Sequence, residues 1–119
     1  MKQNNRAVGA KKEEAAAAFL SRKGYLICEK NYRSKRGEID IIAKKDKYLV
    51  FVEVKYRKNT SFGNPEEAVT LQKQCIISQV AQVYMLTHGY RLETSVRFDV
   101  IAIEGEHIRH YENAFLFRG

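Results

Sequence analysis

The chain has 119 residues, enough for one domain, and its 45% hydrophobic and 29% charged residues with a single proline are typical of a globular protein. This composition excludes fibrous and intrinsically disordered proteins, and no apolar run is long enough to span a bilayer. The net charge of +7 is concentrated in residues 1–36, which hold ten basic and three acidic side chains, so a polyanion is a natural partner, although basic surface can also serve solubility alone.

The cysteines and the N-terminus indicate the compartment. Cys28 and Cys75 lie far apart and lack the spacing of a zinc site, so we expect both to be reduced and partly buried. The first twelve residues contain no apolar signal core. We therefore expect a cytoplasmic protein without membrane contact that folds as a single domain over residues 1–119.

The first predicted element is a helix over Val8–Lys23, where a run of alanines gives high helix propensity and Gly24 supplies the stop. Glu13 lies on the same stripe of this helix as Ala16 and Leu20. Because the rest of that stripe is apolar, we expect the Glu13 carboxylate at its inward-facing end.

Three strands are predicted next, in segments rich in β-branched and aromatic residues. They are Tyr25–Arg33, Glu38–Ala43 and Tyr48–Tyr56. A basic turn separates the first two, and the polar residues 44–47 join the last two as a hairpin. The third strand has large apolar side chains at both parities until Glu53, which indicates a strand buried on both faces in the middle of a sheet.

A second helix and two more strands complete the prediction. Asn64 as N-cap and Glu67 in a capping box predict the start of a long helix that ends near Gly89. A strand over Val96–Ile103 and a short strand over His107–Tyr111 follow. The predicted fold class is therefore α/β, with a central mixed sheet flanked by helices in the order α-β-β-β-α-β-β.

Glu53 and Lys55 are the first candidates for chemistry. They are two residues apart on a strand, so their side chains leave the same face, and both are polar where burial is expected. An ordinary ion pair on an exposed strand is the alternative, because two such residues at this spacing are common in sequences.

Asp40 joins the same face if the hairpin puts Ile42 opposite either Leu49 or Phe51. Two buried carboxylates repel each other, so such a cluster needs a proton or a cation. Mg²⁺ or Mn²⁺ meets that need beside a phosphate and activates the attacking water. Lys55 would then steer that water or neutralise charge that develops in the transition state.

Two stretches carry a resemblance to a known family. Gly37–Ala43 reads Gly-Glu-Ile-Asp-Ile-Ile-Ala, and Phe51–Arg57 reads Phe-Val-Glu-Val-Lys-Tyr-Arg. Together they resemble the motifs of the YraN-type family of predicted endonucleases, which is assigned to the PD-(D/E)XK nuclease superfamily with its restriction endonuclease-like fold. Ile39 stands where the usual superfamily motif has proline. The resemblance covers nearly the whole chain, including Gly9, Glu13, residues 15–20, Gly24, Tyr25, residues 31–33, Phe62, Gly63, Lys73 and residues 97–100.

The resemblance implies roles for individual residues. Asp40 and Glu53 would bind the metal together with the Val54 carbonyl, and Lys55 would be the catalytic lysine. Glu13 would face the site from the first helix. Archaeal Holliday-junction resolvases of similar size belong to the same superfamily and are dimers, so a homodimer is expected, and the apolar residues 114–117 could pack over the sheet or against a second copy.

Six basic residues are candidates for contact with a nucleic-acid backbone, with solvated surface as the alternative for several of them. They are Arg33, Lys35, Arg36, Arg57, Lys58 and Lys73. Glu38 shares the face of Asp40 and is either a third metal ligand or a supporting residue.

Other polar residues carry weaker signals. Arg97 and Asp99 alternate with apolar residues on a strand, which favours a buried pair that supports the core. His88, His107 and His110 lack metal-ligand spacing, and we assign them no role.

We expect a divalent-metal-dependent endonuclease that hydrolyses phosphodiester bonds in nucleic acid, with structured or branched DNA as its substrate. The alternatives are a nucleic-acid-binding module of the same fold that does not cleave, and a basic adaptor that binds an acidic protein.

Overall fold

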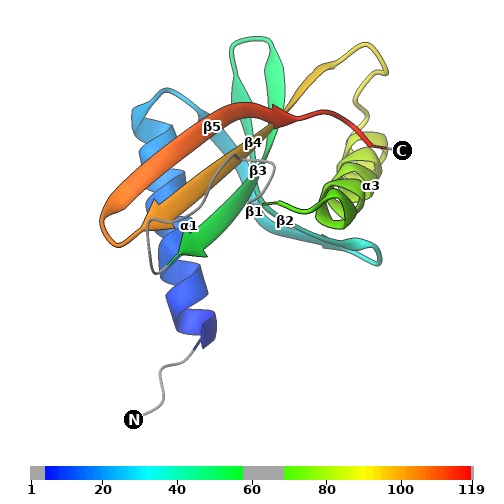
Figure 1. Cartoon of the computed structure of the whole chain (residues 1–119). Helices are drawn as coiled ribbons and strands as arrows, with labels where there is room; N and C mark the ends of the chain where they lie inside the picture. Colours follow the sequence, from blue (N-terminus) through cyan, green and yellow to red (C-terminus); the bar gives the residue numbers. More distant parts are fainter. Residues whose placement is uncertain (1–4, 58–68, 119) are drawn as a thin grey trace.

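The computed structural model describes residues 5–57 and 69–118, with the side chains of residues 11–56 and 69–118. Within these ranges the chain forms an α/β fold in the predicted order α-β-β-β-α-β-β (Figure 1). The elements are α1 (Asn5–Arg22), β1 (Leu26–Ser34), β2 (Gly37–Lys45), β3 (Tyr48–Arg57), α3 (Leu71–Thr87), β4 (Ser95–Glu104) and β5 (His107–Phe115).

The strands form one mixed sheet in the order β1-β2-β3-β4-β5. β3 and β4 pair in parallel, and the other neighbours pair antiparallel. In the β2–β3 hairpin Ile42 lies opposite Phe51, which is one of the two registers that put Asp40 on the face of Glu53. Residues 49–53 are all buried, which confirms that β3 is central.

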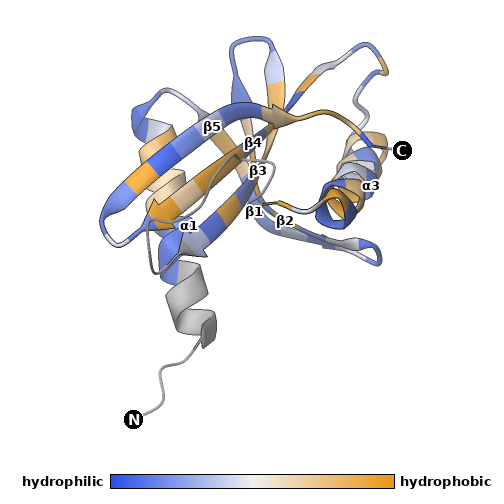
Figure 2. Cartoon of the chain, in the orientation of Figure 1, coloured by the Kyte–Doolittle hydropathy of each residue, from blue (hydrophilic) through white to orange (hydrophobic). Residues whose placement is uncertain are grey.

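Each face of the sheet is covered by one helix. Side chains of even-numbered β3 residues pack with α1, around Ala16, Leu20 and Tyr25. Odd-numbered β3 residues pack with α3, around Val80 and Tyr84. In Figure 2 the inner strand β4 is mostly hydrophobic, whereas the edge strand β5 is mostly hydrophilic.

The helix ends follow the local sequence in part. Gly24 adopts φ +91 just after α1, as expected for a helix stop. α3 begins at Leu71, and its N-cap Thr70 accepts a hydrogen bond from the Lys73 N–H at 3.1 Å. The helix predicted from Asn64 does not run through residues 69 and 70, which are not helical, and its predicted cap at Asn64 and capping-box Glu67 lie outside the described residues.

Two expectations need correction. β5 was expected to end at Tyr111, but pairing with β4 extends it to Phe115, which lies opposite Phe98. Both cysteines are free, but Cys28 is exposed and only Cys75 is partly buried. None of the helices described is both long and apolar enough to cross a membrane.

Candidate active site

Asp40 lies where β2 and β3 separate. The hairpin ladder runs from Lys45 and Tyr48 to Ile41 and Val52 and stops there. Beyond that point the Val54 N–H donates its hydrogen bond to the Asp40 Oδ2, at 2.7 Å. A side chain therefore replaces the backbone acceptor that would continue the sheet.

The alternation of β2 also breaks at Asp40. Ile41 packs on the α1 face, and strict alternation would put Ile39 there too, yet Ile39 belongs to the cluster on the α3 face. Opposite this point in β1, Asn31 has φ +55, a left-handed conformation that is uncommon outside glycine. The irregularity leaves Asp40 between the two faces, within reach of side chains from both helices.

Glu53 is buried, at 6% exposure, and lies between two lysines. Its Oε2 is 3.9 Å from the Lys55 Nζ and 3.8 Å from the Lys73 Nζ. Lys55 comes from the same strand, whereas Lys73 comes from the first turn of α3. The Glu53 charge is thus compensated from the strand and from the helix.

The electrostatics of Asp40 differ from those of Glu53. Burial, followed by the hydrogen bond and the charge of Glu53, raises the pKa of Asp40 to about 8. The Val54 N–H and the Lys73 charge lower this pKa only in part. In the absence of a cation Asp40 is therefore largely protonated at neutral pH.

Two more carboxylates adjoin Asp40. Glu13, Glu38 and Asp40 each offer a carboxylate oxygen, and these oxygens lie within 4.8 Å of one another. Glu13 reaches the cluster from α1, and burial followed by the Asp40 charge raises its pKa. All donors here are carboxylate oxygens, with no thiol or imidazole in the group, and this chemistry fits a hard cation such as Mg²⁺ or Mn²⁺.

The structure brings together Glu13, Asp40, Glu53 and Lys55 as expected, and adds two residues whose part was open. Glu38 joins the acidic group, and its Oε2 is also 3.5 Å from the Nε of Arg33. Lys73 contacts Glu53 and not solvent alone.

Lys35 and Arg36 are not drawn into the cluster. Lys35 and Arg36 form the exposed β1–β2 turn, where the Arg36 N–H bonds to Ser34 Oγ at 3.1 Å. Arg57 ends β3, but its side chain lies outside the description, as does all of Lys58.

A second polar cluster surrounds Asp99 on the α1 face. The Arg97 guanidinium donates to both Asp99 oxygens at 2.8 Å, the His110 Nε2 lies 2.7 Å from Oδ2, and the Asn113 N–H donates at 3.0 Å. The Tyr25 hydroxyl bonds Arg97. The predicted Arg97–Asp99 pair is confirmed, whereas the part of His110 had no signal in the sequence because the β4–β5 pairing creates it.

Burial by itself would raise the pKa of Asp99, but the hydrogen bonds from His110, Arg97 and Asn113 outweigh it and hold this pKa below its usual value. This cluster is self-contained, and a hard cation would find no free carboxylate there.

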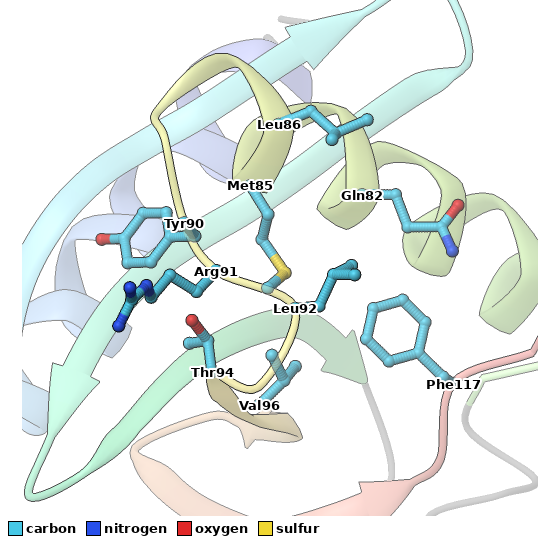
Figure 3. Close-up of a pocket in the computed structure, with 9 residues that line it drawn as sticks. All are labelled: Gln82, Met85, Leu86, Tyr90, Arg91, Leu92, Thr94, Val96 and Phe117. Carbon is cyan, nitrogen blue, oxygen red and sulfur yellow. The ribbon is translucent and has the colours of Figure 1, made fainter.

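An apolar pocket of about 590 Å³ lies away from both clusters (Figure 3). It is lined by Gln82, Met85, Leu86, Tyr90, Arg91, Leu92, Thr94, Val96 and Phe117. Its one charged lining side chain, Arg91, lies 3.8 Å from Glu93. None of the site residues predicted from the sequence lines this pocket, so the pocket is separate from the candidate active site.

Comparison with known proteins gives one consistent result. The model of "Uncharacterised protein family UPF0102" matches residues 12–103, which include all four carboxylates of the cluster and both lysines. A UPF0102 protein of Lachnoclostridium phytofermentans is 49% identical over 112 residues, covering 94% of this chain and 95% of the relative. UPF0102 proteins of Caldanaerobacter subterraneus subsp. tengcongensis and Geobacter sulfurreducens are each 43% identical, covering 96% and 94% of this chain and 98% and 91% of the relatives.

Proposed function

This chain belongs to the UPF0102 family, and we propose that it is a divalent-metal-dependent nuclease of the PD-(D/E)XK, restriction endonuclease-like class. One observation carries the proposal. Asp40, whose pKa is raised to about 8, lies beside Glu13, Glu38 and Glu53, and two lysines lie near the Glu53 carboxylate. Such a group is held together by a cation, and a cation beside lysines suits a phosphodiester substrate.

The metal would be Mg²⁺ or Mn²⁺ on Asp40 and Glu53, with the Val54 carbonyl as a further ligand. When bound, it would supply Lewis acidity at the phosphate and lower the pKa of a water. Asp40 would release its proton on loading, and the Val54 N–H would keep its carboxylate in place. Glu13 and Glu38 are the candidates for completing the oxygen set or holding waters.

The two lysines would then take different parts. Lys55 would leave Glu53 to orient the attacking water or to neutralise charge on the phosphate in the transition state. Lys73 would stay near Glu53 or contact a neighbouring phosphate. The attack forms one phosphorus–oxygen bond, breaks the bond to the leaving oxygen and releases one proton, for which Glu13 with its raised pKa is a suitable acceptor.

Nucleic acid, with structured or branched DNA as the first choice, is the proposed substrate. The basic excess of residues 1–36 and the Arg33, Lys35, Arg36, Arg57, Lys58 and Lys73 side chains are the proposed backbone contacts. A homodimer would match a substrate with two-fold symmetry. A binding module that does not cleave remains the second candidate, since the basic surface would serve it equally.

The experiment uses labelled four-way junctions, flaps, single strands and plain duplex, incubated with purified protein in Mn²⁺ and in EDTA. Wild type should cleave at least one of them in Mn²⁺, whereas Asp40→Asn and Lys55→Ala should not. Asp46→Asn, in the exposed β2–β3 turn, is the matched control and should cleave normally.

Cleavage that persists unchanged in Asp40→Asn would refute the nuclease proposal. Salt-dependent binding without cleavage in any protein would favour the binding module. No binding to any nucleic acid at low salt would favour a basic adaptor for an acidic protein.

A further inference from the structure

Tyr56 is an exposed aromatic side chain that directly follows Lys55 on β3. It is 46% exposed, and the Lys12 Nζ lies 4.7 Å from the centroid of its ring. Lys12 in turn directly precedes Glu13 on α1. Lys12 is therefore the chain neighbour of Glu13, and Tyr56 is the chain neighbour of Lys55, whose ammonium lies beside Glu53, with Cα atoms about 3.8 Å apart in each case.

Packing does not account for this ring. Among the large apolar and aromatic side chains described, only Tyr56 and Phe117 are aromatic and exposed, and Phe117, at 42% exposure, rests on Phe98 at a centroid distance of 4.9 Å. Tyr56 contacts no aromatic ring in the described part of the chain. The Lys12 ammonium lies over a ring that is half exposed.

The strand geometry puts Tyr56 and Lys55 on opposite faces. Lys55 shares the α3 face with Glu53 and Lys73, whereas Tyr56 shares the α1 face with Val54. Cations therefore flank the acidic cluster on both faces, and an aromatic ring lies on one of them. Cations interleaved with an exposed aromatic ring are the pattern by which proteins bind unpaired nucleic-acid strands.

We propose that Tyr56 is a stacking site for an unpaired base next to the phosphate held at the acidic cluster, with Lys12 contacting the adjoining backbone. The proposal rests on the nuclease function above and narrows its substrate to nucleic acid with unpaired nucleotides, such as single strands, flaps or open junctions. In a closed duplex the π-faces of the bases are covered by their neighbours, so this ring cannot reach them unless a base is flipped out.

The test measures binding in EDTA, where no cleavage is needed. The probes are a 12-nucleotide single strand containing 2-aminopurine and its matching duplex, followed by anisotropy and by quenching of 2-aminopurine. Tyr56→Phe keeps the ring and should bind both probes like wild type. Tyr56→Leu should bind the single strand roughly tenfold more weakly, lose the quenching and bind the duplex normally.

Two further variants separate stacking from charge and from general damage. Lys12→Gln should weaken the binding of both probes equally, so that the ratio of the two affinities does not change. It should lower the slope of log affinity against log salt concentration by about one. Phe117→Leu is the matched control, since it removes a ring of similar exposure in the apolar pocket and should leave both affinities unchanged. Thermal unfolding of Tyr56→Leu should match wild type, because the ring is half exposed.

If Tyr56→Leu weakened the binding of the single strand and of the duplex equally, the proposal would be overturned, because Tyr56 would then only position Lys12. No weakening at all would overturn it as well. Selective loss of the single strand supports it even if wild type never cleaves, in which case the nuclease proposal alone fails. Metal-dependent cleavage with an unchanged preference in Tyr56→Leu would mean that only the stacking proposal fails.

Discussion

Asp40 and Asp99 belong to the same sheet, and their surroundings are opposite. Asp99 has a guanidinium, an imidazole and a backbone N–H on its two oxygens, and its pKa is lowered. Asp40 has one backbone N–H and the company of other carboxylates, and its pKa is raised to about 8. A buried acid whose donors all come from the protein supports the fold, whereas one whose neighbours are acids is completed only by a proton or a cation.

Both aspartates lie at irregularities of the sheet, but the irregularities serve them differently. Next to Asp99 the β4–β5 register shifts, and Asn113, with φ +53, turns its N–H toward the carboxylate. Asn31, with φ +55, lies opposite Asp40, and its side chain acts on Glu13 instead, where it opposes the rise in the pKa.

The largest expected effect on stability comes from disrupting the cluster of Asp99. Asp99→Asn removes the charge that compensates the buried Arg97, and we expect it to lower the free energy of unfolding by about 3–5 kcal/mol. Asp40→Asn should be neutral or stabilising in EDTA, because a neutral amide replaces a carboxyl group whose ionised form burial and Glu53 disfavour. Urea denaturation of both variants checks the comparison, and an equal loss in the two would contradict it.

Bound metal should stabilise the folded protein only through the cluster of Asp40, and not through that of Asp99. At about 100 times its dissociation constant, Mn²⁺ should raise the free energy of unfolding of wild type by about 2.7 kcal/mol. Asp40→Asn and Glu53→Gln should abolish most of this gain. If Glu38 is a ligand or holds a ligating water, Glu38→Gln should weaken Mn²⁺ binding by roughly 10- to 100-fold in calorimetry. An unchanged affinity would assign Glu38 to its pair with Arg33 instead.

Stability should depend on pH in opposite directions at the two aspartates. The raised pKa of Asp40 means that its contribution is full below its ordinary value of 3.8 and is lost as the pH rises through about 8. The lowered pKa of Asp99 means that its contribution is present above 3.8 and is lost as the pH falls through its folded value. In EDTA wild type should lose on the order of 2 kcal/mol between pH 5 and pH 9 relative to Asp40→Asn. Parallel curves for the two proteins would show that Asp40 ionises freely.

The contrast also explains what the sequence could predict. Asp40, Glu53 and Lys55 were predictable as a possible group because they lie in one hairpin, where either of two registers puts Asp40 on the face of Glu53, and the structure has one of these. Glu13 was predictable from its helical stripe. Local periodicity and turn residues were likewise enough for the element order.

Features that depend on distant parts of the chain were not predictable. The sequence leaves open whether Lys73 faces solvent, and only the packing of α3 on the sheet brings it to Glu53. The contact of His110 with Asp99 needs the β4–β5 pairing, which also extends β5 to Phe115. The break in β2 at Asp40 has no sequence signal, since Ile39, Ile41 and Ile42 are all equally apolar.

A third buried acid gives the smallest test of the comparison. Glu104 is 6% exposed, and neither of its carboxylate oxygens has a hydrogen-bond partner among the residues described. It lies neither in the cluster of Asp40 nor in that of Asp99, and among the described residues no contact compensates its burial. Glu104→Gln should therefore raise the free energy of unfolding by about 1 kcal/mol in urea denaturation, whereas Glu106→Gln in the exposed β4–β5 turn should have no effect. A loss of stability in Glu104→Gln would mean that this carboxylate has a cationic partner, and that it belongs with Asp99 as a completed acid.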